Sequence, residues 1–168
     1  ANNLGQQRLE LLNKLLNPNS KRFINTYIKT GMSVFEAGCG SGEMTAWIAS
    51  AVGDGGKVIA IDANQEQLNI AKYNAQKNGL LNIEFHFASI EDFSGLGINY
   101  DLAYARFLQI HLKTPNVLLD KFNQVLKSGG TAIFEEPIVS DTHTFPKSDL
   151  WTKSIEIYLE LSQSMGVD

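Results

Sequence analysis

The sequence is poor in cysteine, and this scarcity limits the kinds of site that the chain can build. Its 168 residues contain a single cysteine, Cys39. One thiol forms neither an internal disulfide framework nor a cysteine-based zinc cluster, because both need several cysteines. We therefore expect no metal site, and we expect a reducing, cytoplasmic compartment.

The chain also lacks an excess of positive charge and a long apolar run. Lys and Arg number 14 against 18 Asp and Glu, so the formal net charge is −4. A mildly acidic chain has no general field that attracts DNA or RNA. No apolar run reaches the roughly 18–20 residues that cross a bilayer. We expect neither a nucleic acid nor a membrane as a partner.

The remaining composition is that of an ordinary globular domain. Hydrophobic residues make up 43% and charged residues 19%. A chain of this length is typical of one domain, since domains run to about 100–200 residues. The N-terminus has no secretory signal pattern, and because the chain starts with Ala1 we expect a processed or trimmed product.

Helical periodicity marks the N-terminal segment. Leucines over residues 4–16 recur mostly at spacings of three, four and seven, which predicts a helix. The proline-containing run at 17–20 predicts its end. A second short helix with an apolar stripe over 23–28 follows. We expect residues 1–30 to form a helical cap and residues 31–168 to form the core.

The core alternates short apolar runs with amphipathic helical segments. This alternation predicts a doubly wound, Rossmann-like parallel sheet with helices on both faces. The expected strands are residues 32–37, 57–62, 83–87, 100–105 and 131–135, and the expected helices are 43–52, 65–78, a segment around 117–126, and 149–165.

A glycine-rich turn links the first strand to the first core helix. Gly38, Gly40 and Gly42 lie there, and the backbone N–H groups of such a turn can contact a ligand. Asp62 ends the next strand, where a carboxylate can bind both hydroxyls of a ribose. These features predict a nucleoside-bearing ligand at the carboxyl ends of the strands.

The acidic residues around this turn decide which nucleoside is expected. The dinucleotide pattern G-x-G-x-x-G has Glu43 in place of its third glycine, and Glu36 lies just before the turn. Two acids disfavour a pyrophosphate but suit a ligand with an ammonium and a sulfonium group. S-adenosyl-L-methionine is such a ligand.

Five segments, in order, resemble the landmarks of class I S-adenosylmethionine-dependent methyltransferases. The resemblance covers roughly residues 20–137, and it is specific for the family but nearly silent on the substrate. The segments are 34–43 (Val-Phe-Glu-Ala-Gly-Cys-Gly-Ser-Gly-Glu), 58–62 (Val-Ile-Ala-Ile-Asp), 88–92 (Ala-Ser-Ile-Glu-Asp), 100–107 (Tyr-Asp-Leu-Ala-Tyr-Ala-Arg-Phe) and 125–130 (Val-Leu-Lys-Ser-Gly-Gly).

The resemblance implies a role for each matching position in binding the cofactor, whose product is S-adenosyl-L-homocysteine. Ser89 departs from the pattern, since many members have an acid there that binds the adenine amino group. The implied contacts are Glu36 and the backbone through Gly38, Cys39 and Gly40 for the methionine end, Asp62 for the ribose, Ala63, Gln67, Ser89 and the Ile90 N–H for the adenine, and Arg106 for the methyl group or the methionine carboxylate.

Several of these residues also have a plain structural interpretation. Cys39 is expected to pack rather than to act as a nucleophile. Arg106 is equally compatible with a surface ion pair. His111, which follows the fourth expected strand, is either a structural histidine or a group near the acceptor.

The sequence says less about the methyl acceptor and the residues that bind it. Methyl transfer needs a base only when the acceptor must lose a proton, and we select His111 and Glu135 as candidates, with Glu136 and His143 as further candidates near the ends of the fourth and fifth expected strands. Members that methylate nucleic-acid bases have an Asn-Pro-Pro-Tyr-like segment after strand four, and metal-dependent catechol-type members have carboxylates there. This chain has Ala-Arg-Phe-Leu at 105–108. A small molecule or a protein side chain is therefore favoured.

The family's sheet has seven strands, whereas five are expected here. We therefore expect a C-terminally truncated chain that lacks the last two strands, with the fifth strand at a sheet edge. The N-terminal helix is expected to serve either as a lid over the cofactor or as a packing or dimer helix, so a homodimer is possible.

Two alternatives from other classes remain. One is a nicotinamide-dependent oxidoreductase with a degenerate glycine loop. The other is a non-catalytic module that binds S-adenosylmethionine, because methyl transfer requires no invariant base.

Overall fold

The fold is a five-stranded, all-parallel sheet with the strand order β3-β2-β1-β4-β5. A computed structural model of the chain describes residues 3–94 and 99–164. The strands are β1 (Ser33–Ala37), β2 (Lys57–Asp62), β3 (Ile83–Phe87), β4 (Tyr100–Arg106) and β5 (Leu126–Glu135). This architecture confirms the predicted doubly wound α/β class, with β5 at one edge as expected.

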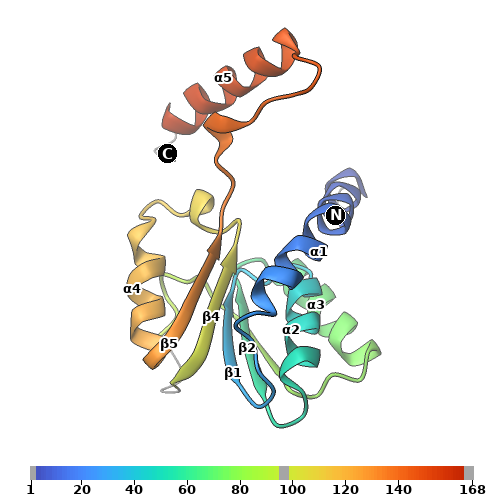
Figure 1. The fold of residues 1–168 in the computed structure, drawn as a ribbon, viewed down its shortest axis with the longest axis vertical. Coiled ribbons are helices and arrows are strands. Elements are labelled where there is room, and N and C mark those ends of the chain that lie inside the picture. Colours follow the sequence, from blue (N-terminus) through green and yellow to red (C-terminus); the bar gives the residue numbers. More distant parts are fainter. Residues whose placement is uncertain (1–2, 95–98, 165–168) are drawn as a thin grey trace.

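Helices cover both faces of the sheet (Figure 1). The helices α2 and α3 pack against the strands from one side, and α4 covers the other. The helix α5 stands apart from the sheet, beyond the carboxyl ends of the strands. The helices are α1 (Asn3–Ile24), α2 (Glu43–Val52), α3 (Gln65–Lys77), α4 (Asn116–Val125) and α5 (Asp149–Ser164), with short 3-10 turns η1 (Gln109–His111) and η2 (Val139–Asp141).

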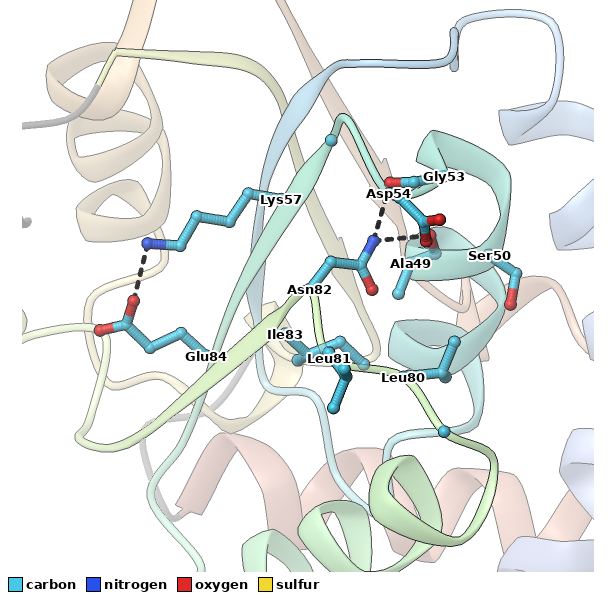
Figure 2. Close-up of a pocket in the computed structure, with 12 residues that line it drawn as sticks. Ala49, Ser50, Gly53, Asp54, Lys57, Leu80, Leu81, Asn82, Ile83 and Glu84 are labelled. Carbon is cyan, nitrogen blue, oxygen red and sulfur yellow. Dashed lines mark hydrogen bonds and ion pairs between the residues drawn. The ribbon is translucent and has the colours of Figure 1, made fainter.

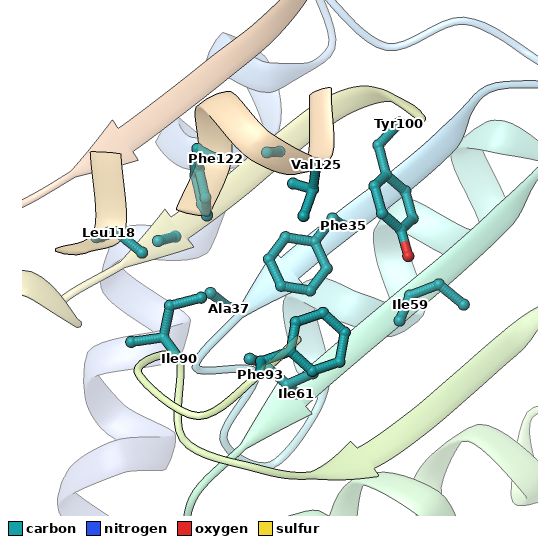
Figure 3. Close-up of a cluster of buried hydrophobic side chains, with 12 residues drawn as sticks. Phe35, Ala37, Ile59, Ile61, Ile90, Phe93, Tyr100, Leu118, Phe122 and Val125 are labelled. Carbon is teal, nitrogen blue, oxygen red and sulfur yellow. The ribbon is translucent and has the colours of Figure 1, made fainter. Parts of the chain in front are cut away.

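Aromatic side chains fill the layer between the sheet and α4 (Figure 3). Phe35 of β1 is fully buried and stacks on Phe93 with ring centroids 5.2 Å apart. The edge of the Phe122 ring, from α4, meets Phe35 at 6.0 Å. A second cluster, with Val34, Ile48 and their neighbours, fills the space beneath α2. The two clusters hold the strand ends in fixed relative positions.

The N-terminal segment differs from the prediction. The helix α1 runs without a break through Pro18, whereas the sequence indicated an end at residues 17–20 and a second helix over 23–28. Asn17 and Ser20, read as turn formers, are 7% and 5% exposed, and their side chains bind groups of the core. These tertiary bonds outweigh the local cost of a proline inside a helix.

The start of β5 was also predicted wrongly. The strand begins at Leu126, not at residue 131, and includes Gly129 and Gly130. Its pairing with β4 shifts register between Tyr100 and Leu102, which marks a bulge. Gly129 has φ +79, a conformation that favours glycine. The two glycines accommodate the bulge instead of ending a helix. Residues 95–98 and Met165, which the sequence placed in a loop and a helix, lie outside the described residues.

Within residues 3–94 and 99–164, we found no helix with both the length and the apolar character that crossing a bilayer requires.

Truncation of Phe35 tests the core. We expect Phe35→Ala to lower the free energy of unfolding by about 3–5 kcal/mol, because it removes a buried ring from between the sheet and α4. Urea denaturation measures this change. The control is Leu81→Ala, whose side chain is 96% exposed. We expect a change below about 0.5 kcal/mol for the control, and similar losses for both variants would contradict this description of the core.

Candidate functional site

A cavity of about 360 Å³ lies at the carboxyl ends of β1 and β4. We call it the inner cavity. Its volume falls in the range typical of small-molecule sites, and its place is the one where open parallel sheets bind ligands. The lining residues are Asn13, Glu36, Gly38, Cys39, Gly40, Ser41, Glu43, Met44, Asn64, Gln67, Tyr104, Arg106, Phe107 and His111.

The glycine-rich turn forms one wall of the inner cavity. Gly38 and Gly40 have φ of +72 and +52, which side chains rarely adopt. The backbone N–H groups of Gly38 and Cys39 donate to the carbonyl of Ile61, so the turn is tied to β2. Gly42 has φ +80, and a Cβ added there would lie 2.7 Å from Cβ of Ala71 on α3. Glycine thus shapes the turn and lets α2 approach α3.

Asp62 holds the turn in place. Its Oδ2 accepts the backbone N–H of Gly40 at 2.7 Å, and its Oδ1 accepts that of Asn64 at 2.7 Å. The carboxylate therefore positions the backbone that faces the inner cavity. Its predicted contact with a ribose remains a prediction.

Glu36 brings an uncompensated carboxyl group to the inner cavity. The side chain is 3% exposed, and its Oε2 has no hydrogen-bond partner. Burial raises the pKa of Glu36 from 4.5 to about 7, although the Thr45 hydroxyl and, to a smaller extent, the Arg106 guanidinium act in the opposite direction. A buried carboxylate oxygen without a partner is costly, and a cationic ligand would relieve that cost.

Arg106 joins the end of β4 to α1. Its Nη1 donates to Oδ1 of Asn17 at 2.8 Å and to Oγ of Ser20 at 3.2 Å, and its Nη2 donates to Oδ1 of Asn13 at 3.0 Å. Asn17 donates in turn to Oε2 of Glu43 at 2.9 Å. The arginine thus fastens α1 over the inner cavity, and its predicted contact with the cofactor remains a prediction.

Glu135 is the last residue of β5, and its carboxylate bonds to side chains of α1 and β4. Its Oε2 accepts the hydroxyl of Ser20 at 2.5 Å, and its Oε1 accepts that of Tyr104 at 3.3 Å. Burial, with a smaller contribution from Glu135, raises the pKa of Tyr104. The acid does not line the inner cavity.

His111 does line the inner cavity, from an exposed position at the end of η1. The turn before it is held by Glu136, whose Oε1 accepts the backbone N–H groups of Leu108 at 3.0 Å and Gln109 at 2.8 Å. Of the two catalytic candidates, the structure therefore brings only His111 to the inner cavity.

The three residues predicted at the adenine besides Gln67 are not in the lining of the inner cavity. The Ser89 hydroxyl donates to Oδ2 of Asp92 at 2.7 Å and accepts its N–H at 3.1 Å. Ile90 is 4% exposed and packs in the core beneath α4. Ala63 is exposed. Their roles remain predictions.

Cys39 is 7% exposed and carries a free thiol. Burial raises its pKa, and the Glu36 carboxyl acts in the same direction. The nucleophilic thiolate is therefore disfavoured, in agreement with the expected packing role.

Sequence reasoning missed several residues of the site. Asn13 and Met44 were assigned only to apolar or helical segments, and Asn64 was read as loop. Tyr104 lies two positions before Arg106 on β4, so strand alternation alone could have placed it on the same side. Phe107 has φ +55, a strained backbone for a residue that is not glycine.

Phe107 also lines a second cavity of about 450 Å³ between α1 and the ends of the strands. We call it the outer cavity. The residues around it are Leu16, Asn19, Ser20, Phe23, Phe107, Phe134, Glu135 and Glu136.

A larger cavity, of about 870 Å³, lies at the amino ends of β2 and β3 (Figure 2). Its polar groups are mostly engaged: Asn82 donates to the carbonyls of Ala49 and Gly53, and Lys57 pairs with Glu84 at 2.8 Å. It contains none of the residues predicted to bind a cofactor. We therefore assign the functional site to the inner cavity in spite of its smaller volume. Within the described residues, no group of His, Cys, Asp and Glu side chains could hold a metal ion.

Comparison with known proteins shows the family of this chain. A family model described as a methyltransferase domain matches residues 28–161. The chain belongs to this methyltransferase family. S-adenosylmethionine is the methyl donor of these enzymes, so the nicotinamide alternative does not apply.

The methyltransferase domain is similar to curated relatives of two genera. It is 25% identical to the ubiquinone/menaquinone biosynthesis C-methyltransferase UbiE of Shewanella baltica (strain OS155), over 94% of this chain and 71% of the relative. It is 28% identical to UbiE of Vibrio campbellii, over 82% of this chain and 58% of the relative.

Solved methyltransferases share the fold. An S-adenosylmethionine-dependent methyltransferase from Aquifex aeolicus is 28% identical, with a TM-score of 0.59 over 64% of this chain and 57% of that one. Coclaurine N-methyltransferase, solved with N-methylheliamine and S-adenosylhomocysteine, is 25% identical, with a TM-score of 0.63 over 69% of this chain and 34% of that one. The methyltransferase domain thus spans little more than half, or less, of these two solved chains.

The inner cavity fits the donor that the family uses. S-adenosylmethionine carries an ammonium and a sulfonium, and the lining of the cavity includes the buried acid Glu36. No atom lies within 4 Å of the place where a Cβ of Gly40 would stand, so the backbone there admits close contact with a ligand. The chemistry of these groups matches a cationic nucleoside.

Glu36 makes the stability of the cofactor-free methyltransferase depend on pH. Its pKa is raised in the folded state, from 4.5 to about 7, so the free energy of unfolding falls as pH rises through this window. We expect Glu36→Gln to be more stable than the wild type at pH 8 by up to about 3 kcal/mol, with little difference at pH 4.5. Urea denaturation at both pH values measures this. The control Glu66→Gln, on the exposed side of α3, is expected to show no such divergence.

Glu36 should also make the affinity for the donor depend on pH, but here the affinity rises with pH while the stability falls. We expect affinity for S-adenosylmethionine to fall as pH drops below about 7, because protonation of Glu36 removes its charge. Glu36→Gln should bind at least about tenfold more weakly at pH 8 and lose the pH dependence. Calorimetric titration measures both, and a wild-type affinity that stays constant between pH 6 and pH 8 would contradict the assignment.

Arg106→Leu tests the attachment of α1. The substitution leaves Asn13, Asn17 and Ser20 without their shared donor, so we expect amides of α1 to exchange with deuterium about tenfold faster or more. The control is Arg22→Leu, because Arg22 is exposed and bonds only to Asn19 of the same helix. Equal exchange in both variants would show that Arg106 does not fasten the helix.

Proposed function

We propose that this methyltransferase transfers the methyl group of S-adenosylmethionine to a small molecule. The observation that carries the proposal is the buried carboxyl group of Glu36, a residue that lines the inner cavity and whose Oε2 has no hydrogen-bond partner among the described residues. The glycine-rich turn also lines this cavity, and Asp62 fixes that turn. Together these groups favour a nucleoside that bears positive charge.

The protein contributes position, charge and exclusion of water. When bound, the donor supplies an activated methyl group on a sulfonium and leaves as S-adenosylhomocysteine. Glu36 orients its cationic end, and the turn from Gly38 binds along it. Tyr104, which pairs with Glu36 across β1 and β4, and Phe107 also line the cavity. Holding acceptor, methyl and sulfur in line accounts for most of the acceleration of such a displacement.

A general base is required only for an acceptor that must lose a proton. His111 is the candidate at the inner cavity, and Glu135 is the candidate at the outer one. Glu135 already accepts two hydroxyls, from Ser20 and Tyr104. His111 is therefore our first candidate for the base and Glu135 the second.

Properties of the chain support a small-molecule acceptor over larger partners. The net charge of −4 gives no field for nucleic acid, and the two cavities that meet at Phe107 are of small-molecule size. A protein side chain is the other acceptor that fits this site. We include no nucleic acid and no membrane among the proposed partners.

Two further parts of the proposal concern the setting of the enzyme. The free thiol of Cys39 supports a reducing, cytoplasmic compartment. A homodimer is supported by large apolar side chains on α5, such as Leu150 and Leu161, which are 82% and 58% exposed.

Binding and turnover test the proposal. We expect wild-type protein to bind S-adenosylmethionine and to transfer its labelled methyl group to components of a metabolite extract. Gly40→Val and Asp62→Ala should each abolish donor binding while the circular-dichroism spectrum stays folded, because the first strains the turn at φ +52 and the second releases it. The control is Asp54→Ala, an exposed turn residue at the other end of the strands.

The outcome separates an enzyme from a binding module. Donor binding without labelled product from any extract fraction would favour the non-catalytic alternative. Retained affinity in both Gly40→Val and Asp62→Ala would remove the site assignment itself.

A further inference from the structure

The helix α5 is amphipathic, but one apolar side of it is exposed. Leu150, Ile157 and Leu161 recur at helical spacing and are 82%, 47% and 58% exposed. The helix stands apart from the sheet and packs against the short turn η2 (Figure 1). Single apolar side chains are common on protein surfaces, but a stripe of them along one helix marks an interaction surface.

The spacing of this stripe is the same in both directions along the helix. Leu150, Ser154, Ile157 and Leu161 follow one another at intervals of four, three and four residues, the spacing of the contact positions in two-stranded coiled coils. The Ser154 hydroxyl donates to the carbonyl of Trp151 at 2.7 Å, so it is bonded within α5 and an apolar neighbour can cover it. We call these four residues the α5 seam.

A spacing of this kind fits a second copy of the same helix in the antiparallel orientation. A pair centred on the middle of residues 150–161 places Leu150 against Leu161 of the second copy. The same pair places Ser154 against Ile157 of the second copy. Because a two-fold axis produces each contact twice, every residue of the α5 seam then has a partner.

The charges beside the α5 seam are complementary in this orientation. Lys153 and Glu160 each directly precede a seam residue, and the antiparallel pair brings Lys153 of each copy to Glu160 of the other. Lys153 donates to Glu156 of its own helix at 3.0 Å, and its ammonium has further protons to donate. A parallel pair would place Lys153 beside Tyr158 instead. The charges therefore favour the antiparallel pair.

The other flank of the α5 seam is aromatic. Trp151 and Tyr158 each directly follow a seam residue, and both rings are partly exposed. The antiparallel pair brings Trp151 of each copy to Tyr158 of the other. Contacts between aromatic rings are favourable beyond the area they bury. Both flanks thus select the same partner, a second copy of α5 in one register.

We propose that two copies of this chain associate through their α5 helices, packed antiparallel along the α5 seam. The inference rests on the homodimer of the proposed function and gives it an interface and an orientation. Because α5 lies beyond the carboxyl ends of the strands, the contact stands at the same end of the sheet as the inner cavity.

Sedimentation equilibrium of the 168-residue chain measures the association. Two short helices form a small interface, so we expect a monomer–dimer equilibrium with a Kd on the order of 10 µM. A chain that stays monomeric up to about 200 µM would overturn the proposal, since a dimer of that affinity would then predominate. Assembly beyond the dimer would overturn it as well, because a two-fold contact is closed.

Leu161→Glu tests the α5 seam. The substitution places a carboxylate against Leu150 of the second copy at both ends of the contact, so we expect Kd to rise at least about a hundredfold. The matched control is Gln163→Glu, which adds the same charge at an exposed position of α5 outside the seam. Its Kd should stay within about threefold of the wild-type value. Unchanged association of Leu161→Glu, with a folded circular-dichroism spectrum, would overturn the assignment.

Exchange of charges tests the orientation. Lys153→Glu leaves acids at both positions and Glu160→Lys leaves bases at both, so each variant alone should dimerise about threefold to tenfold more weakly than the wild type. An equimolar mixture of the two should form a heterodimer with about the wild-type Kd, because opposite charges meet again at both contacts. Absence of any gain on mixing would contradict the antiparallel register.

Titration with S-adenosylhomocysteine is carried out on the same samples. If this product binds while the chain stays monomeric, the inference about α5 fails and the proposed methyl transfer stands. If the dimer and its variants behave as expected while the product does not bind, the proposed methyl transfer fails and the α5 contact stands.

Discussion

The buried carboxyl group of Glu36 is the constraint around which the site is organised. It lies one residue before the end of β1, whose Val34, Phe35 and Ala37 pack in the core, and its Oε2 has no hydrogen-bond partner among the described residues. Such a group is costly in a stable fold. The raised pKa expresses that cost, and a positively charged donor would offset it.

Hydrogen bonds between distant segments bring the rest of the site to this carboxyl group. Asp62 of β2 orders the glycine-rich turn, and Arg106 of β4 binds three side chains of α1. The N-terminal helix is therefore part of the walls of both cavities. Asn13 lines the inner cavity, and Phe23 lines the outer one. Because α1 lines both cavities, its attachment through Arg106 affects the walls of both.

The two cavities are lined by side chains of different kinds. The inner one combines backbone, Glu36 and Gln67, as a nucleoside with a cationic tail requires, whereas the outer one combines aromatic rings with Glu136. Phe107 lines both cavities. The larger cavity at the amino ends of the strands takes no part, because parallel sheets present their ligand-binding loops and helix N-termini at the carboxyl ends.

Local pattern was sufficient for the α/β class of the sheet and for the glycine-rich turn after β1, since alternating apolar runs and adjacent glycines express their structure within a few residues. Tertiary structure alone decided that α1 continues through Pro18 and that β5 starts at Leu126. These outcomes depend on bonds between residues as far as 115 positions apart, such as Ser20 to Glu135. No local propensity contains that information, because the energy of such a bond exists only after the chain has folded.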